Sequence, residues 1–230
     1  MNIGSLNTIR KKSLSVKWKL VFIPVLIFLL NSCIGLSMNI QMNRNGSGRI
    51  TMEYRISRFL DIGTLDGNEH MPAIPVGRQD WERTVQRIPG ARLISHSTRE
   101  TSGDIIITAV LGFSTPQALA AIIDPSEEKV SINHNGQNGS LSIIISDESD
   151  NEKYDPNLAA LMNSVFSDYS FSVVFNAPGN SALIVTDGTG NSKPMPSSAA
   201  VVSPGRRISF SMNINEILYA RGGIGVTINW

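Results

Sequence analysis

The sequence contains a single cysteine, Cys33, whose type and position are the clearest pointer to chemistry in the chain. A thiol can form a disulfide, ligate a metal, act as a nucleophile or carry a covalent modification. A lone cysteine cannot form an intrachain disulfide or a multi-cysteine zinc site. Cys33 directly follows a strongly apolar segment, so we expect its role to depend on that segment.

The other residue types used in catalysis are scattered along the chain. The three histidines, His70, His96 and His134, lack the i, i+4 spacing of a helical zinc motif. No Gly-x-Ser-x-Gly motif marks a nucleophile among the 28 serines. Acidic neighbours such as Glu127 and Glu128 lie in polar stretches, where we expect a solvated surface rather than a tuned acid–base pair. We therefore predict no catalytic residues, no metal site, no cofactor and no enzymatic activity.

Glycine-rich segments at 46–48, 187–190 and 222–225 are the only stretches that invite comparison with a phosphate-binding loop. Such a loop leads from a strand into the N-terminus of a helix. All three segments lie beside predicted strands instead. We therefore expect them to form turns.

Residues 1–32 differ in composition from the rest of the chain. They contain five basic residues and no acidic residue. Their apolar run of 11 residues, 20–30, is too short to cross a bilayer, which takes about 20 residues. Pro24 also disfavours a long uninterrupted helix. A basic start followed by a short apolar region is typical of a secretory signal peptide, so we predict a signal peptide over 1–32 and an exported domain over 33–230.

The junction Leu30-Asn31-Ser32-Cys33 resembles the lipobox of bacterial lipoproteins. Leu30 and Ser32 match that motif, whereas Asn31 is larger and more polar than the usual occupant. The resemblance implies cleavage before Cys33 and attachment of diacylglycerol to its sulfur, so that palmitate-type chains hold the protein at the cell membrane on its exported side. Each buried CH₂ contributes roughly 0.8 kcal/mol, so two chains give a stable anchor. Cleavage at another position, or an uncleaved anchor, is the alternative.

Loss of the leader changes the charge of the protein. The whole chain has 20 basic and 19 acidic residues, and the leader takes five of the basic ones, which leaves 15 against 19 and a net charge of −4. A nucleic-acid-binding protein would show a basic stripe, and adhesion to anionic headgroups would need a polybasic patch. We therefore predict the membrane, reached through the Cys33 anchor, as a partner and no nucleic acid.

Alternation of apolar and polar residues predicts most of the secondary structure. Period-two patterns on either side of an Asn-Gly turn predict a β-hairpin over 36–57. Further hairpins are expected over 91–113, whose second strand is nearly all apolar and predicted to be covered on both faces, and over 129–146. Single strands are expected over 171–175, 182–186, 197–202, 208–214 and 224–230. Apolar residues at spacings of three and four predict helices over 78–88, 116–123 and 155–166, with a helical turn over 215–220.

This order of elements predicts an α+β fold in which antiparallel hairpins form a sheet with about three helices packed on it. An acidic stretch places a subdomain boundary near 147–155. Methionines on the predicted apolar faces are expected in the core, together with Trp81. If the helices cover the sheet incompletely, the same residues would line an apolar groove suited to an acyl chain. These methionines are Met38, Met42, Met52, Met162 and Met212.

The segment 37–56, SMNIQMNRNGSGRITMEYRI, resembles the start of LppM-type bacterial lipoproteins, in which a hairpin with an Asn/Asp-Gly-Ser-Gly turn follows the lipidated cysteine. The segment 171–179, FSVVFNAPG, resembles a second recurrent segment of that family. The resemblance covers about half of the chain beyond the leader. It implies an exported α+β domain that faces outward from a membrane and binds lipid or glycolipid, and it supplies no catalytic residue.

We therefore predict a membrane-anchored, non-catalytic binding module, with lipid or glycolipid as the favoured ligand. The alternative is a structural or assembly lipoprotein that binds another envelope protein through an apolar patch or an unpaired strand edge. The strand that ends at Trp230 is a candidate for such an edge, although an ordinary terminal strand is the favoured interpretation. An envelope hydrolase is a third alternative, which would require titratable groups that converge in a cleft.

Overall fold

The computed structural model describes residues 34–58, 75–147, 168–194, 196, 199–202, 205–218, 220 and 222–230. The leader, Cys33, His70, Met162 and the predicted helix over 155–166 lie outside the described residues, as does most of the predicted boundary near 147–155. The elements are β1 (Ile34–Met42), β2 (Gly48–Ser57), α2 (Arg78–Gln86), β3 (Ala91–Glu100), β4 (Asp104–Phe113), α3 (Pro116–Ile123), β5 (Val130–Asn135), β6 (Asn138–Ser146), β7 (Ser170–Asn176), β8 (Ala182–Thr186), β9 (Ala200–Val202), β10 (Arg207–Asn213), α5 (Ile214–Leu218) and β11 (Ile224–Asn229).

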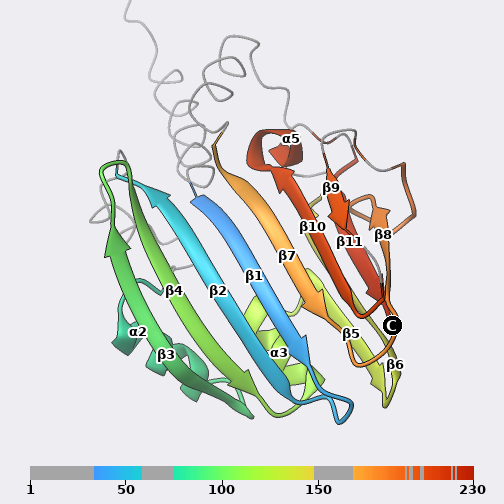
Figure 1. Cartoon of the computed structure of the whole chain (residues 1–230), viewed down its shortest axis with the longest axis horizontal. Coiled ribbons are helices and arrows are strands. Elements are labelled where there is room, and N and C mark those ends of the chain that lie inside the picture. The colour runs from blue at the N-terminus through green and yellow to red at the C-terminus, as the bar shows by residue number, and fades with distance from the viewer. Residues whose placement is uncertain are drawn as a thin grey trace, which may run out of the picture. The chain divides into compact units, whose positions relative to one another are not determined.

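The strands form two sheets rather than the single sheet that we predicted (Figure 1). The larger sheet has seven strands in the order β3-β4-β2-β1-β7-β10-β9, and the smaller has four in the order β5-β6-β11-β8. The hairpin β5–β6 belongs to the smaller sheet, in which β11 pairs with β6. The α+β class is confirmed, and the described part of the chain contains three short helices.

The large sheet is mixed, whereas we predicted antiparallel pairing throughout. β1 and β7 run parallel, with Leu36 opposite Phe171 and Ile40 opposite Phe175. A parallel pair requires a long connection, and the chain between these two strands includes the whole of β2 to β6. The parallel register places the apolar side chains of both strands on the same face of the sheet.

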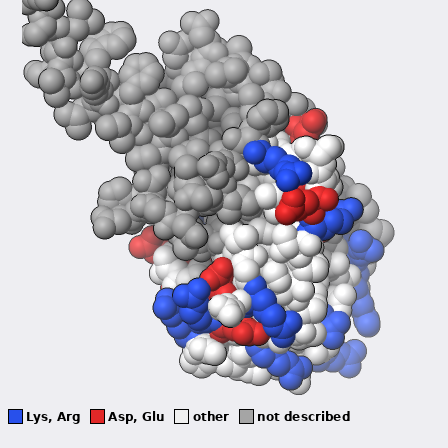
Figure 2. Space-filling view, turned by 90° about the vertical axis from the view of Figure 1, so that its left-hand side faces the viewer, with Lys and Arg blue, Asp and Glu red and all other residues white. Residues whose placement is uncertain are grey.

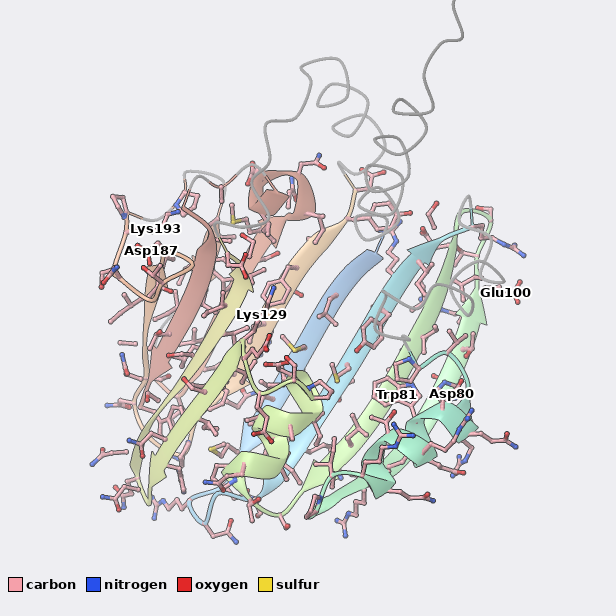
Figure 3. The ribbon with its side chains drawn as sticks, turned by 180° about the vertical axis from the view of Figure 1, so that it is seen from behind. Asp80, Trp81, Glu100, Lys129, Asp187 and Lys193 are labelled. Carbon is pink, nitrogen blue, oxygen red and sulfur yellow. The ribbon has the colours of Figure 1, made fainter. Side chains whose placement is uncertain are left out.

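That common face holds the core. α2, α3 and the four-stranded sheet all lie behind the large sheet (Figures 1 and 3). The buried side chains of both sheets belong to one hydrophobic cluster, with Met38, Met52 and Trp81 each at most 2% exposed. Met42 and Met212 are buried too, so the described methionines fill the core and do not line an acyl groove. The prediction of a core role for them is confirmed.

Two helices follow from local sequence signals. In α3, the Thr115 hydroxyl accepts a hydrogen bond from the Ala118 amide at 3.1 Å, and Pro116 occupies the first turn. Leu119 is fully buried against the sheet. In α2, Trp81 points toward the sheet (Figure 3). Both helices occur where the sequence predicted them.

The structure corrects one expectation about an individual strand and excludes one candidate edge. β4 is an interior strand, but only one of its faces is fully covered, because the outward side chains of Ile106, Thr108 and Val110 are half-buried. β11, which leads to Trp230, is not an edge, because it lies between β6 and β8. Its alternating apolar residues are buried between two partner strands.

Candidate functional site

The face of the large sheet that points away from the core carries mainly small polar side chains. On β1 the outward residues are Ser37, Asn39 and Gln41, which alternate with buried Met38 and Ile40. β2, β7 and β10 also alternate buried apolar residues with mostly polar or charged outward residues, whereas β4 presents Ile106, Thr108 and Val110 on this face. Figure 1 is viewed from this side, and no described helix or strand lies across these strands. We call this surface the outer face.

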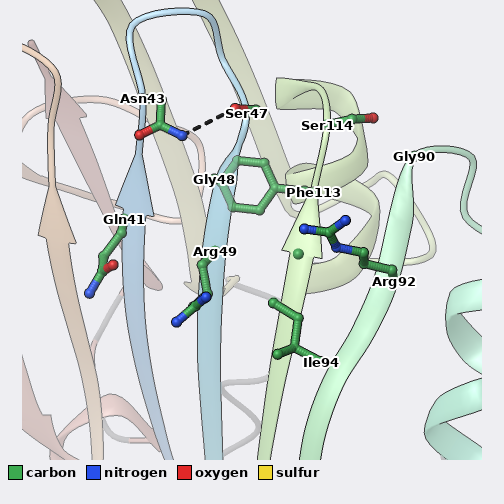
Figure 4. Close-up of a pocket in the computed structure, with 11 residues that line it drawn as sticks. Gln41, Asn43, Ser47, Gly48, Arg49, Gly90, Arg92, Ile94, Phe113 and Ser114 are labelled. Atoms are coloured by element: carbon green, nitrogen blue, oxygen red, sulfur yellow. Dashed lines mark hydrogen bonds between the residues drawn. The ribbon is translucent and has the colours of Figure 1, made fainter.

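A hollow of about 520 Å³ lies at the end of the outer face next to the β1–β2 turn (Figure 4). Its lining includes Arg49 and Arg92, together with Gln41 and Gly112. We call it the arginine hollow. Its eleven lining residues include no acidic side chain.

The turn that borders the hollow has a fixed conformation. The backbone N–H of Asn43 donates a hydrogen bond to the backbone carbonyl of Ser47 at 2.8 Å, and Gly46 adopts a positive φ of 79°. Gly48 must lack a side chain, because a Cβ there would lie 2.1 Å from the Gln41 carbonyl oxygen and 2.5 Å from the Phe113 ring. The segment 46–48 is thus a turn, as predicted, and it also forms one wall of the hollow.

Strand register brings the two arginines together. Gln41, Arg49, Gly112 and Arg92 lie in one row across β1, β2, β4 and β3. Adjacent strands are about 4.8 Å apart, so the backbones of Arg49 and Arg92 are separated by about 10 Å. A Cβ on Gly112 would lie 2.9 Å from Nε of Arg92. The Arg92 side chain therefore lies over Gly112, and Figure 4 shows it crossing β4 toward β2.

The hollow is electropositive. Neither Arg49 nor Arg92 takes part in an ion pair with any described residue. Two unit charges at the roughly 10 Å that separates these backbones would repel each other by only about 0.4 kcal/mol in water, so the fold tolerates them. Basic side chains line the lower right margin of Figure 2, where the outer face is seen edge-on. An anion placed between the two guanidinium groups would be attracted by both.

The other end of β2 carries a contrasting polar cluster. Asp104 accepts hydrogen bonds from Nε of Arg55 and from the Tyr169 hydroxyl, both at 2.7 Å. The Arg55 guanidinium lies 5.2 Å from the centre of the Tyr169 ring. Burial would raise the pKa of Asp104, but these two hydrogen bonds outweigh it and hold the pKa below its ordinary value. The cluster joins β2, β4 and the residue before β7, so we interpret it as structural.

The structure does not bring the other candidate residues together. Nε2 of His96 lies 3.0 Å from the Val76 carbonyl oxygen, and Nε2 of His134 lies 3.1 Å from that of Arg44. Glu127 and Glu128 lie in the exposed loop after α3. Among the described residues, no three His, Cys, Asp or Glu side chains form a group that could hold a metal ion. No helix in the same ranges is long and apolar enough to cross a membrane.

Sequence reasoning missed the arginine hollow. Arg49 and Arg92 are 43 residues apart and belong to different hairpins. Each occurs at a polar position of an alternating strand, which by itself indicates only exposure to solvent. The available signal was Gly112, a glycine inside an otherwise apolar strand, because such a glycine often marks the close approach of another group.

Comparison with known proteins finds similarity to a solved structure. No family model matches the sequence, and no curated protein matches it. The NMR structure of the folded domain of LppM from Mycobacterium tuberculosis is similar with a TM-score of 0.46 and 10% sequence identity. The similarity covers 86% of this chain and 88% of that chain. A similarity of this degree establishes neither family membership nor function.

Proposed function

We propose that this chain is a lipid-anchored, exported protein that binds a ligand on its outer face without catalysing a reaction. The observation that carries the proposal is the arginine hollow, in which two arginines without acidic partners among the described residues border an open polar surface. The favoured ligand class is lipid or glycolipid, bound through its polar headgroup. The packed methionine core argues against a site for the acyl chain between the layers.

The proposed anchor would hold the domain close to the bilayer. Cys33 directly precedes Ile34, the first residue of β1. Gln41, at the hollow, lies seven residues further along the same strand, which corresponds to about 23 Å. A short tether of this kind would allow the outer face to meet headgroups when the sheet lies along the membrane surface.

The anchor is tested in the organism that makes the protein. Metabolic feeding with radioactive palmitate should label the chain, and Cys33→Ser should abolish both the label and its sedimentation with membranes. An unlabelled chain, or a Cys33→Ser variant that still sediments with membranes, would refute the anchor.

The ligand is tested by native mass spectrometry of the full chain extracted from membranes in a neutral detergent. We expect a lipid or glycolipid adduct on the wild-type chain. Repeated recovery of ligand-free protein would refute lipid binding. A variant with altered outer-face polarity far from the hollow, Ser211→Ala on β10, serves as the matched control and should keep the adduct.

One observation favours the alternative of an assembly protein. β3 is a ten-residue edge strand, which pairs only with β4 among the described strands, and its Ile94 side chain is 39% exposed. Such an edge can accept a strand from a partner. A photo-crosslinking residue in place of Ile94 should capture one envelope protein in intact cells if this alternative is correct. Crosslinks to lipid alone would support the headgroup-binding function.

A further inference from the structure

The chemistry of the arginine hollow defines a ligand more narrowly than the proposed function does, and the inference rests on that function. We propose that the hollow binds a phosphate-class oxyanion, held between the guanidinium groups of Arg49 and Arg92. The oxyanion belongs either to a lipid headgroup or to a soluble phosphate ester. The geometry is the same for both sources.

The first argument is that the two arginines share one row of the sheet. Arg92 extends from the edge strand across Gly112 toward β2, where Arg49 occupies the same row of the sheet. The Cβ that any other residue would carry at position 112 would lie 2.9 Å from Nε of Arg92 and 3.4 Å from Cδ1 of Ile94. The glycine therefore leaves room for the Arg92 side chain to cross β4 and approach the row position of Arg49. An anion of suitable size in the hollow would lie near both positive charges and remove their repulsion.

The second argument is the shape of the donor set. A guanidinium group presents planar pairs of N–H donors that match two oxygens of one anion. A carboxylate has only two oxygens, which lie in a single plane with one negative charge, so it matches two arginines less well. A phosphate group carries oxygens in several directions and about two negative charges near neutral pH as a monoester. It can therefore accept hydrogen bonds from two arginines on opposite sides.

The third argument is the polar rim. Asn43 and Ser47 are engaged with each other, since Nδ2 of Asn43 donates to Oγ of Ser47 at 3.1 Å (Figure 4). The Gln41 amide and the Ser114 hydroxyl also line the hollow, and neither side chain has a hydrogen-bond partner among the described residues. Both can donate to an oxyanion or to a hydroxyl group attached to it. The hollow of about 520 Å³ is large enough for a phosphate together with such a group.

The experiment uses the full chain in a neutral detergent. Inorganic phosphate and glycerol 3-phosphate are titrated by isothermal calorimetry, and phosphatidylglycerol is titrated against phosphatidylcholine by native mass spectrometry. We expect saturable binding by the wild-type chain that weakens as salt is added. Arg49→Gln or Arg92→Gln should each weaken it at least tenfold, and the double variant should abolish it.

Two further variants make the test specific. Arg99→Gln is the matched control, because it removes the same charge from the same strand and face as Arg92, in a row that lies outside the hollow. It should change the affinity less than twofold. Gly112→Ala retains both charges but displaces Arg92, and it should weaken binding several-fold. Since Arg49 and Arg92 are exposed and make no described ion pair, unchanged urea midpoints should show that their variants fold.

The outcomes separate this inference from the proposed function. Binding that is equal in the double variant and the wild type, or that Arg99→Gln weakens as much as Arg92→Gln does, would overturn the oxyanion site. A membrane lipid that stays on the double variant would also overturn it, while leaving lipid binding elsewhere intact. Arginine-dependent phosphate binding by a chain that carries no palmitate would uphold the site and refute the anchor. Binding of phosphatidylglycerol but not of soluble phosphate would identify the headgroup as the source.

Discussion

Replacing Tyr169 by Phe tests whether the Asp104 cluster stabilises the fold as its geometry implies. The substitution removes one hydroxyl and keeps the aromatic ring, which is 7% exposed and lies beside the Arg55 guanidinium. It therefore deletes the hydrogen bond of 2.7 Å to Oδ1 of Asp104 and leaves the ring contact in place. Arg55 continues to hold the other carboxylate oxygen.

The magnitude follows from the kind of hydrogen bond that is lost. A hydrogen bond to a charged group contributes roughly 1.5–3 kcal/mol, and the carboxylate of Asp104 is left with an unsatisfied lone pair in a site that is 7% exposed. We expect the free energy of unfolding to fall by about 2 kcal/mol at pH 7. This is a large share of the stability of an ordinary domain, which is roughly 5–15 kcal/mol.

The same cluster predicts the pH dependence of the effect. Because the pKa of Asp104 is lower in the folded state, its stabilising contribution is present above about pH 4, the unfolded value, and is lost as the pH falls toward the folded value. Tyr169→Phe removes one of the two hydrogen bonds that lower this pKa. The variant should lose less stability on acidification, so the difference between the two proteins should shrink below pH 4.

Urea denaturation of the full chain, followed by circular dichroism at pH 7 and near pH 3, measures both quantities. Glu100→Gln is the control, because the Arg58–Glu100 pair is exposed on both sides, at 47% and 61%, and should contribute less than about 1 kcal/mol. A Tyr169→Phe variant as stable as the wild type at pH 7 would refute the assigned role. A difference that stays constant down to pH 3 would refute the linkage to Asp104.

Three other substitutions test the packing and the turns by the same urea titration. Thr115→Ala removes the N-cap of α3 and should cost about 1 kcal/mol, and no change would mean that the cap is dispensable. Gly48→Ala should cost more than about 2 kcal/mol, because its Cβ would lie 2.1 Å from the Gln41 carbonyl oxygen; a wild-type midpoint would contradict this close approach. Trp230→Ala should cost about 3–5 kcal/mol, since its ring lies 4.9 Å from that of Phe175 and is 7% exposed; a loss under 1 kcal/mol would show that this contact between the sheets is unimportant.

The sequence could predict elements because short-range patterns determine them. The Thr115-Pro116 start and the Asp124-Pro125 stop delimit α3 in the structure as they do in the sequence. The hairpins likewise follow from alternation around glycine-containing turns. In each case, the residues that decide the structure lie within a few positions of one another, so no knowledge of distant partners is needed.

Strand partners could not be predicted in the same way. Alternation in Phe171–Phe175 shows which side chains are buried but does not show which strand lies alongside. The structure pairs this segment with β1 in parallel and with β10 in antiparallel orientation. The choice between one sheet and two depends on how distant apolar faces cover each other, and this information is spread over the whole chain.

The arginine hollow was hidden from the sequence for a related reason. The register of β3 against β4 shifts between Leu93 and Ser95. Strict alternation would place Arg92 and Arg99, seven residues apart, on opposite faces. The extra residue in β3 brings both onto the outer face, opposite Gly112 and Ile106 of the same strand. A pattern that assumes regular alternation therefore assigns one of them to the wrong side.

The two ends of β2 show why the hollow, and not the Asp104 cluster, is the candidate binding site. Arg49 and Arg55 project from the same strand on the same face. At one end, β4 supplies Asp104 beside Arg55, and the charge is neutralised within the fold. At the other end, β4 supplies Gly112 opposite Arg49, and Arg92 adds a second positive charge. The charge of Arg55 is thus balanced inside the fold, whereas Arg49 and Arg92 line a hollow that contains no acidic side chain, and an anion from outside is what would balance their charge.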